Sequence, residues 1–221
     1  MLTVHHLNNS RSQRVLWLLE ELGVPYEVVR YERDPKTMLA PAALKAVHPL
    51  GKSPVVTVDG ETIAETGAIL EFILERYGQG RLAPPAGTPE ARQMRYWLHY
   101  AEGSAMSPLL LKLVFSRMSG RAPGLLKPLV GSIASRAQVE VVDPQLKAHF
   151  DYWEAELSKT GWFAGPAFSA ADVMMSFPVE AAAARGGALE GRPRLTQFLK
   201  TIHARPAYQR ALERGGPYAY A

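Results

Sequence analysis

The spacing of hydrophobic positions changes type several times near the start of the chain. Apolar and polar residues alternate over 2–7, which predicts a strand. Apolar positions over 15–22 recur at helical spacing, which predicts an amphipathic helix that ends at Gly23. A second strand is expected over 26–31, followed by a short helix over 42–46.

The next segments predict a hairpin and a longer helix. Residues 55–58 and 61–64 have the pattern of two strands joined by a primed turn at Asp59-Gly60. Helical spacing returns over 67–77. The resulting order β-α-β-α-β-β-α indicates a small mixed sheet with helices on both faces. Its first β-α-β unit implies two parallel strands joined by a right-handed crossover.

The rest of the chain carries a different pattern. Residues 79–88 are rich in Gly and Pro and predict a linker. Strand alternation is lost beyond them and helical spacing recurs, so we expect an α/β domain over 1–78 and an all-helical domain over 89–221. Three Gly and two Pro residues within 117–137 predict a loop or a broken helix there.

One helix start in the second domain has a specific signature. Residues 169–172 (SAAD) have the form of a capping box, with Asp in place of the usual Glu, and an apolar run follows them. Asp172 is therefore expected to stabilise the first turn of a helix, and we do not expect it to take part in chemistry.

Composition narrows the class of protein. The chain has 221 residues, of which 47% are hydrophobic, and this favours a globular protein with a sizeable core. It contains no cysteine, which excludes a disulfide framework, a Cys-ligated metal and a Cys nucleophile. Six His residues without a close i, i+4 pair indicate no metal site. There is no signal-peptide pattern and no apolar stretch long enough to span a membrane, so we expect a soluble, cytoplasmic protein.

The net charge of +4 is unevenly distributed. Residues 1–78 hold 8 Lys/Arg against 10 Asp/Glu, a balance of −2, whereas residues 79–221 hold 17 against 11, a balance of +6. The basic residues are scattered and do not interleave with aromatic ones. This favours a solvated basic surface over a nucleic-acid-binding face.

A cluster of small polar residues lies where the first strand meets the first helix. Asn8, Asn9, Ser10 and Ser12 all precede the amphipathic helix. A helix N-terminus has free backbone N–H groups and the positive end of the helix dipole, so it can hold an anion. The same residue types also favour helix caps, and one of them is expected to cap this helix.

Four motifs in order give the chain a resemblance to the cytosolic glutathione S-transferases. They are the segment 48–56 (HPLGKSPVV), the pair Glu65-Thr66, the capping segment 168–172 (FSAAD) and the segment 205–208 (RPAY). The resemblance covers nearly the whole chain. It implies a thioredoxin-like first domain that binds glutathione and a helical second domain. Residues 101–104 and 172–178 are similar to those of a small fungal subgroup and its bacterial relatives.

The resemblance suggests which anion the polar cluster holds, namely the glutathione thiolate. Thioredoxins place C-x-x-C here, but this chain has no sulfur of its own at this position. Ser10 lies four residues before Arg14, the spacing at which serine-type members place the hydroxyl that stabilises the thiolate. Ser12 is the rival, and on a helical turn it would point away from Ser10. Asn8 and Asn9 are further candidates.

Four other residues are implied to bind glutathione. Lys52 would meet its glycine carboxylate, unless it is only a solvated turn residue. Ser53, ahead of an expected cis proline at Pro54, would bind the cysteinyl part through its main chain. Glu65 would meet the γ-glutamyl ammonium, and Thr66 would hold the γ-glutamyl carboxylate at a helix N-terminus or serve only as a cap.

Two features of the site are less defined by the resemblance. The family's Asn before Pro is His48 here, and a structural role is expected for it. The pocket for a hydrophobic electrophile should lie between the domains. Tyr100, Glu102, Ser104, Met106 and Phe115 could contribute to it, although aromatic and Met residues at helical spacing usually belong to the core.

The resemblance therefore implies an enzyme that conjugates the glutathione thiolate to small electrophiles, with glutathione peroxidase activity as an addition. A glutathione-dependent disulfide reductase and a non-catalytic glutathione-binding module are the alternatives. Family members pair as homodimers, the first domain of one chain lying against the helical domain of the other. Glutathione is the expected co-substrate, no metal is expected, and neither nucleic acid nor a membrane span is expected.

Overall fold

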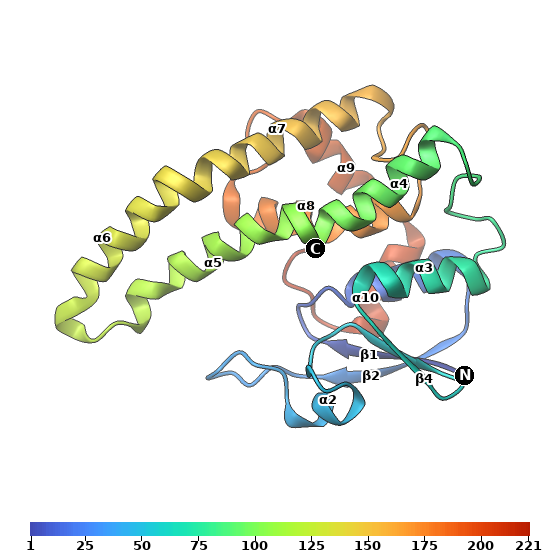
Figure 1. The fold of residues 1–221 in the computed structure, drawn as a ribbon, viewed down its shortest axis with the longest axis horizontal. Coiled ribbons are helices and arrows are strands. Elements are labelled where there is room, and N and C mark those ends of the chain that lie inside the picture. The colour runs from blue at the N-terminus through green and yellow to red at the C-terminus, as the bar shows by residue number, and fades with distance from the viewer.

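The computed structural model describes residues 1–221, apart from the exposure of Gly186. The first part of the chain forms a four-stranded sheet of order β2-β1-β3-β4 (Figure 1). The strands are β1 (Leu2–Leu7), β2 (Tyr26–Tyr31), β3 (Val55–Val58) and β4 (Glu61–Ala64). β1 and β2 run parallel, whereas β3 is antiparallel to both β1 and β4. The predicted mixed sheet and its parallel first pair are confirmed.

Three helices cover this sheet. α1 (Gln13–Leu22) and α3 (Thr66–Tyr77) lie on the face toward the rest of the chain, and α2 (Ala42–Val47) lies on the other face (Figure 1). α1 buries side chains around nearly its whole circumference, because the sheet and the helical domain enclose it. The predicted element order of this domain is confirmed.

The turn between β3 and β4 has the predicted geometry. Asp59 and Gly60 have φ values of 51° and 86°, and this pair of positive φ angles is what a type I′ hairpin turn needs. Asn and Asp adopt this conformation more readily than other residues with a side chain, and Gly adopts it without steric cost.

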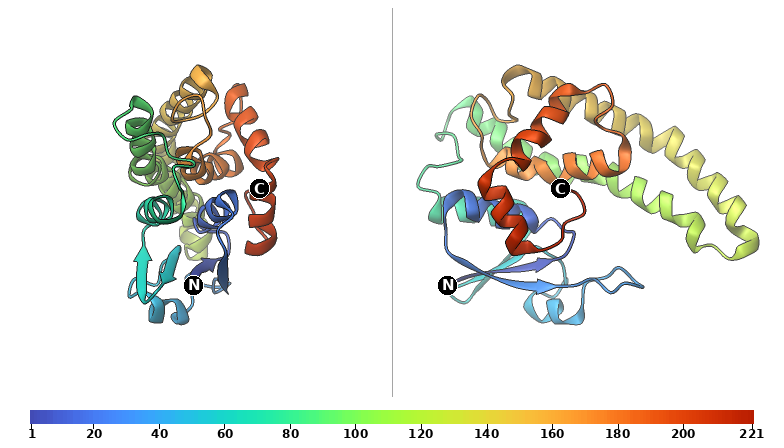
Figure 2. Two further views of the ribbon diagram at one scale, coloured as in Figure 1. Left: turned by 90° about the vertical axis from the view of Figure 1, so that its right-hand side faces the viewer. Right: turned by 180° about the vertical axis from the view of Figure 1, so that it is seen from behind.

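The second part of the chain is helical. α4 (Pro89–Tyr100) and α5 (Met106–Arg121) are joined through a π-helical segment at Ala101–Ala105. After a 3-10 turn, α6 (Lys127–Ala137) runs back toward the main body, and Figures 1 and 2 show the pair as a long hairpin projecting from it. Of the two alternatives expected over 117–137, the broken helix is confirmed, because the helical segment is interrupted at 122–126, whereas a loop over the whole range is wrong. Pro128 does not break α6, because it lies in the first helical turn, where no N–H is needed.

The remaining helices complete the domain and attach it to the sheet. They are α7 (Asp143–Thr160), which follows a second π-helical segment, α8 (Ala170–Gly186), α9 (Pro193–His203) and α10 (Pro206–Gly215). α1 packs against α10 and α8, so the first domain contributes a helix to the second domain's core.

The predicted capping box at the start of α8 is confirmed. Ser169 Oγ accepts the Ala171 backbone N–H at 3.3 Å, and Asp172 Oδ2 accepts the Ser169 N–H at 2.8 Å. Asp172 Oδ1 also accepts the Phe163 N–H at 2.8 Å. Asp172 thus joins α8 to the loop before it, as a structural residue. Within the described residues, no helix combines the length and the hydrophobicity that a membrane span requires.

Candidate active site

The polar loop before α1 places two serine hydroxyls side by side. Ser10 Oγ lies 2.7 Å from Ser12 Oγ and accepts a hydrogen bond from the Ser12 backbone N–H at 3.3 Å. Both side chains are buried. Ser12 would point away from Ser10 only on a helical turn, and that condition is not met, because both residues precede the first regular turn of α1. Ser12 takes the N-cap position of α1 without a side-chain cap, so the capping hydrogen bond expected from this cluster is not formed, and the Ser10 contact lies before the helix.

A histidine on β1 continues this chain of hydrogen bonds. His6 Nδ1 lies 2.9 Å from Ser12 Oγ. Burial and the nearby charge of Arg30 lower the pKa of His6 to about 4, although a hydrogen bond to the Gly215 backbone opposes this shift. His6 is therefore neutral at pH 7, and with Nε2 protonated its Nδ1 can accept the Ser12 hydrogen. Ser12 Oγ can then accept the hydrogen of Ser10.

Both asparagines of the loop are used by the fold. Asn8 donates from its amide to Glu32 at 2.6 Å and accepts the Arg33 backbone N–H at 3.1 Å. Asn9 has a φ of 48°, a conformation that asparagine tolerates better than most residues, and its Oδ1 accepts the Ala219 N–H at 2.8 Å. These amides hold the loop between β2 and the C-terminal segment.

The loop before β3 is attached to β1 next to the serines. The Ser53-Pro54 peptide bond is cis, as predicted. Ser53 Oγ donates to the His5 carbonyl at 2.8 Å and accepts the Leu7 N–H at 3.2 Å. The hydroxyl is thus engaged by the neighbouring strand. Since Leu7 leads directly into the loop that carries Ser10, these bonds hold the two loops at one end of the sheet.

The start of α3 differs from its prediction. Thr66 is the first residue of the helix and does not cap it, while Glu65 takes the N-cap position without a side-chain cap. Glu65 has φ 71° and ψ 123°, a conformation rare for a residue with a side chain and more often retained at functional sites. Glu65 is exposed, whereas Thr66 is buried.

An arginine links this helix start to the serine loop. Arg14 is 1% exposed and donates to Thr66 Oγ1 at 3.3 Å and to the Met174 carbonyl at 2.8 Å. It also pairs with Glu102 in the π-helical segment, and Arg11 pairs with the other Glu102 oxygen at 2.8 Å. Four segments that lie far apart in the sequence are thereby brought together at the domain boundary.

The charged groups of this network shift one another's pKa values. Burial opposes ionisation of Glu102, but the guanidinium groups of Arg14 and Arg11 outweigh it and hold its pKa below the ordinary value. Burial lowers the pKa of Arg14, and Glu102 counteracts this. From the sequence, Arg14 served only to place Ser10, and Glu102 was expected only as a candidate for the electrophile pocket. A buried Arg cannot be recognised from helical spacing alone.

The remaining predicted residues lie in varied surroundings. Lys52 is exposed and makes no ion pair with any residue the structure describes. His48 ends α2, and its carbonyl accepts the Gly51 N–H at 2.8 Å in the turn before Lys52. Its Nδ1 is buried with no hydrogen-bond partner among the described residues.

The candidates for the electrophile pocket differ in their burial and in their partners. Tyr100 and Met106 are buried, as the core interpretation expects, and the Tyr100 hydroxyl accepts the Trp153 indole N–H at 3.0 Å. Phe115 is half-buried against the core. Ser104 is exposed, and Glu102 is committed to the two arginines.

The C-terminal segment reaches the same region, which the sequence analysis missed. Tyr218 donates to Glu180 at 2.6 Å, and its neighbour Ala219 bonds to Asn9, one residue before Ser10. The Tyr220 ring meets Phe177 edge-to-face at 5.7 Å, and the Arg11 guanidinium lies 5.4 Å from the same Phe177 ring. Two tyrosines in a terminal segment otherwise made of Gly, Pro and Ala are the signal that could have drawn attention to it.

The comparisons with known proteins agree with this arrangement. The family model described as glutathione S-transferase, N-terminal domain, matches residues 1–75, and the one described as glutathione S-transferase, C-terminal domain, matches residues 109–206. Glutathione S-transferase 1 of Saccharomyces cerevisiae is 34% identical, over 97% of this chain and 95% of its own length. The chain belongs to the glutathione S-transferase family.

Solved structures of the family have the same fold. A glutathione S-transferase from Actinobacillus pleuropneumoniae matches with a TM-score of 0.79 and 30% identity, over 97% of this chain and 93% of that one. A sphingomonad glutathione S-transferase, solved in complex with glutathione, matches with a TM-score of 0.76 and 24% identity, over 97% and 98% of the two chains. At 24% identity, the match to the sphingomonad structure shows a shared fold only.

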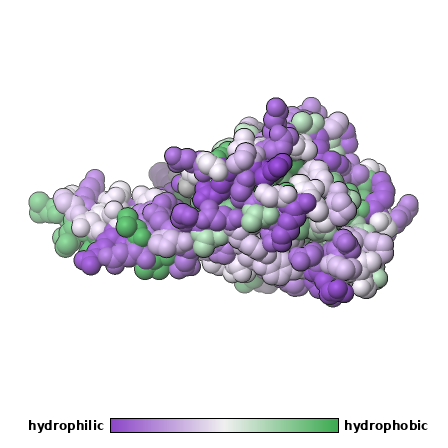
Figure 3. Space-filling view, turned by 90° about the horizontal axis from the view of Figure 1, so that it is seen from above, coloured by the Kyte–Doolittle hydropathy of each residue, from purple (hydrophilic) through white to green (hydrophobic). Residues whose placement is uncertain are grey.

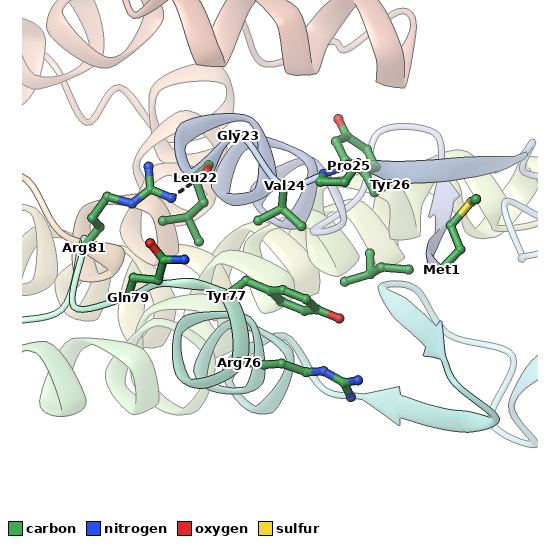
Figure 4. Close-up of a pocket in the computed structure, with 11 residues that line it drawn as sticks. Met1, Leu22, Gly23, Val24, Pro25, Tyr26, Arg76, Tyr77, Gln79 and Arg81 are labelled. Atoms are coloured by element: carbon green, nitrogen blue, oxygen red, sulfur yellow. Dashed lines mark hydrogen bonds between the residues drawn. The ribbon is translucent and has the colours of Figure 1, made fainter.

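One cavity of this glutathione S-transferase lies away from the serine loop. It has a volume of about 670 Å³ and is lined by β1, the α1–β2 turn and the end of α3, including Leu22, Tyr26, Tyr77 and Arg81 (Figure 4). None of the predicted site residues lines it. Among the described residues, no cluster of three His, Asp or Glu side chains has a geometry that could hold a metal ion.

Proposed function

We propose that this glutathione transferase ionises the thiol of glutathione at Ser10 and conjugates the thiolate to small hydrophobic electrophiles. The observation that carries the proposal is the convergence of three elements: the Ser10 loop, the cis-proline loop and the start of α3. The Ser53 hydrogen bonds to β1 and the Arg14–Thr66 bond hold these elements together.

Ser10 is proposed to donate its hydroxyl hydrogen to the thiolate. A free thiol has a pKa near ~8.5, and a hydrogen bond to the charged form favours ionisation. Lowering the thiol pKa by about 2 units corresponds to roughly 2.7 kcal/mol of differential stabilisation. Reaction needs no covalent intermediate with the protein, because ionisation and positioning are sufficient.

Ser12 and His6 are proposed as positioning residues for Ser10. Without glutathione, the Ser10 hydrogen is directed at Ser12, whose own hydrogen is accepted by neutral His6. When a thiolate lies beside Ser10, one hydrogen bond is exchanged for a stronger one to a charged acceptor. The Ser12 N–H continues to hold the Ser10 oxygen at 3.3 Å, so only the hydroxyl hydrogen has to turn.

The remainder of glutathione is proposed to lie along the three elements. Lys52 binds the glycine carboxylate, and its exposed ammonium has no competing ion pair among the described residues. Ser53 binds through its main chain, since its hydroxyl is engaged by β1. Thr66 offers its backbone N–H at the start of α3 to the γ-glutamyl carboxylate, and Glu65 meets the ammonium.

The domain assignment follows from these roles. We propose that residues 1–78 bind glutathione, that 79–88 are a linker, and that 89–221 supply the surface for the electrophile. The C-terminal segment with Tyr218 and Tyr220 forms part of that surface, because it bonds to Asn9 beside Ser10.

Two measurements on one sample test the function. Calorimetry measures glutathione binding, and conjugation to 1-chloro-2,4-dinitrobenzene is then followed across pH. Binding together with turnover is the expected result. Binding without conjugation contradicts the proposed reaction and directs the assay to organic hydroperoxides and glutathione-mixed disulfides. Absence of binding contradicts the roles of Lys52, Glu65 and Thr66.

A further inference from the structure

The surface proposed for the electrophile carries a guanidinium without a carboxylate partner. Arg185 lies in the last turn of α8 and is half-buried. It donates to the Tyr220 hydroxyl, and it makes no ion pair with any residue that the structure describes. Figure 3 shows hydrophilic residues over much of one face of the molecule, so an exposed cation by itself marks no site. Arg185 differs because it is partly withdrawn from water without a compensating charge.

Two aromatic rings connect Arg185 with the loop that carries Ser10. The guanidinium carbon of Arg185 lies 4.8 Å from the centroid of the Tyr220 ring, and that ring meets Phe177 edge-to-face with centroids 5.7 Å apart. The guanidinium carbon of Arg11, the residue directly after Ser10, lies 5.4 Å from the Phe177 centroid. These residues form a chain of contacts that begins beside Ser10 and ends at Arg185.

The cations of this surface repel one another. Burial lowers the pKa of Arg185, and the positive charges of Arg117 and Arg11 lower it further, whereas Tyr218 opposes them. Like charges that lie close together disfavour the charged form of each group. An anion bound beside Arg185 would offset both the burial and the repulsion.

Two carboxylates at the domain boundary already have partners of their own. Both oxygens of Glu102 accept hydrogen bonds from guanidinium groups of the serine loop and α1. Glu180 is 1% exposed and accepts hydrogen bonds from two tyrosine hydroxyls, each at 2.6 Å. Neither carboxylate pairs with Arg185. A negative group for Arg185 therefore has to come from a ligand.

We propose that the electrophiles of this enzyme carry a carboxylate, which the Arg185 guanidinium binds while the apolar part of the molecule lies against Phe177 and Tyr220. The inference rests on the conjugation proposed above and names the substrate class of that site. A guanidinium presents paired N–H donors that match the two oxygens of a carboxylate, and hydrogen bonds between charged partners are stronger than neutral ones. A cation at the end of α8 also interacts favourably with the helix dipole, so the experiment has to separate this structural role from ligand binding.

The reaction is a substitution that needs neither an oxidant nor a reductant. With 4-chloro-3,5-dinitrobenzoate, the thiolate sulfur supplies the electron pair of a new C–S bond at the carbon that bears chlorine. The C–Cl bond breaks, chloride leaves with its electron pair, and the thiol proton has passed to solvent beforehand. The carboxylate lies across the ring from the reacting carbon, so Arg185 and the thiolate can act on the two ends of one molecule.

A pair of matched electrophiles tests the proposal on the full chain. The first is 4-chloro-3,5-dinitrobenzoate, and the second is 1-chloro-2,4-dinitrobenzene, which lacks the carboxylate. Their intrinsic reactivities differ, so the readout is the ratio of their kcat/KM values in each variant relative to that in the wild type. In Arg185→Gln this ratio should fall by about tenfold or more, against the carboxylate. A ratio within twofold of the wild type overturns the proposal.

Three further variants separate ligand binding from structure. Arg185→Lys keeps the charge at the helix end and should retain part of the preference for the carboxylate. Tyr220→Phe removes the hydroxyl that Arg185 contacts but keeps the guanidinium, so the ratio should persist whatever happens to the absolute rates. Arg194→Gln removes an exposed cation of α9 and should leave the ratio unchanged. An equal fall in Arg194→Gln would show only the general attraction of a basic protein and would contradict the role of Arg185.

Glutathione also carries carboxylates, so its own binding is measured in the same variants by calorimetry. Its dissociation constant should change less than threefold in Arg185→Gln. If glutathione binds at least tenfold more weakly to Arg185→Gln and the ratio of the two electrophiles is unchanged, the guanidinium binds glutathione and the inference is wrong.

A binding measurement distinguishes failure of this inference from failure of the proposed conjugation. Calorimetry with and without glutathione compares 3,5-dinitrobenzoate with 1,3-dinitrobenzene, neither of which has a chloride to lose. We expect the carboxylate compound to bind about tenfold more tightly or better, and we expect Arg185→Gln to abolish the difference. Absence of turnover with both chloro compounds contradicts the conjugation, and the binding difference then still decides the role of Arg185. Turnover of the neutral compound without any binding difference overturns this inference alone.

Discussion

At the scale of single residues, the site depends on which hydroxyl controls the thiolate. Ser10 and Ser12 lie 2.7 Å apart, so proximity alone does not separate them. Their burial and their other hydrogen-bond partners separate them. Ser12 is completely buried and is bonded to His6, whereas Ser10 retains 4% exposure and stands one residue from the C-terminal segment's contact with Asn9. Ser10 is therefore the one that can reach a ligand with little rearrangement.

Replacement of Ser10 tests this assignment. In Ser10→Ala, we expect the pKa of the bound glutathione thiol to rise by about 1–2 units, because the donor to the thiolate is lost. The glutathione dissociation constant should change little, since the other contacts remain. The measurement is a pH titration of thiolate absorbance in the ultraviolet, alongside calorimetry.

Ser12→Ala is the matched control for this experiment. It removes a positioning contact and leaves the donor, so turnover should fall less than tenfold and the thiol pKa should stay near that of the wild type. Wild-type behaviour in Ser10→Ala together with loss of activity in Ser12→Ala or Asn9→Ala would reverse the assignment.

The pKa of His6 is about 4, so its titration should not appear in the activity profile near neutral pH.

The sequence predicted candidate residues for the site, but it did not predict the hydrogen bonds that hold them together. Ser10, Ser53 and Thr66 were predicted from motifs, and the structure places all three on adjoining elements. Their partners could not be predicted, because the Ser53–Leu7 and Arg14–Thr66 bonds join positions 46 and 52 residues apart. The Thr66 cap failed for a local reason, since Glu65 adopts a positive φ that motif spacing does not reveal.

At the scale of elements, the π-helical segment between α4 and α5 supplies a contact between the two domains. Such segments change the direction in which side chains leave a helix, and they are frequent at functional sites. Glu102 lies in this segment and bonds to both Arg11 and Arg14. Strand alternation and helical spacing both predict regular elements, so neither could locate this irregularity.

Glu102→Gln tests the network through stability. The substitution leaves the Arg14 guanidinium buried without its carboxylate, which should cost about 2 kcal/mol of unfolding free energy at pH 7, within the range for breaking a partly exposed ion pair. The arginines hold the pKa of Glu102 below its ordinary value in the folded state. The stabilisation is therefore present above the unfolded-state pKa of about 4.3 and is lost as pH falls through the lower folded-state value.

Urea unfolding of the wild type and of Glu102→Gln at pH 7 and at about pH 3 measures this dependence. The difference between the two proteins should be full at pH 7 and should shrink in acid. Glu140→Gln, at an exposed ion pair with Arg136, provides the control and should cost well under 1 kcal/mol. A difference that does not change with pH would assign the effect of Glu102→Gln to packing and not to charge.

At the scale of the whole molecule, the oligomeric state is a prediction from the family resemblance. Two chains of 24.3 kDa make a homodimer of twice that mass. We expect light scattering after size-exclusion chromatography to give the dimer mass at micromolar concentration. The first domain carries a net charge of −2 and the rest of the chain +6, which is compatible with pairing of unlike domains. A stable monomer under these conditions would contradict the prediction.

The two domains should also unfold as one unit. Trp17 on α1 is fully buried. Its ring centroid lies 5.1 Å from that of Tyr208 of α10, in edge-to-face geometry, and 5.5 Å from that of Phe168. Glu21 accepts two hydrogen bonds from Arg205, at 2.6 and 2.9 Å. Separation of the domains would expose this indole and its aromatic partners to water, so a state with one domain folded alone carries a large hydrophobic cost.

Scanning calorimetry of the whole chain distinguishes cooperative from stepwise unfolding. We expect a single transition whose calorimetric and van't Hoff enthalpies agree, counted per cooperative unit. Trp17→Ala should lower the unfolding free energy by about 3–5 kcal/mol, because it removes the side chain that both domains enclose. It should also separate the transition into two, since the shared packing that couples the domains is lost. Two transitions already present in the wild-type protein would mean that the domains fold independently, and Trp17→Ala would then weaken only the first domain.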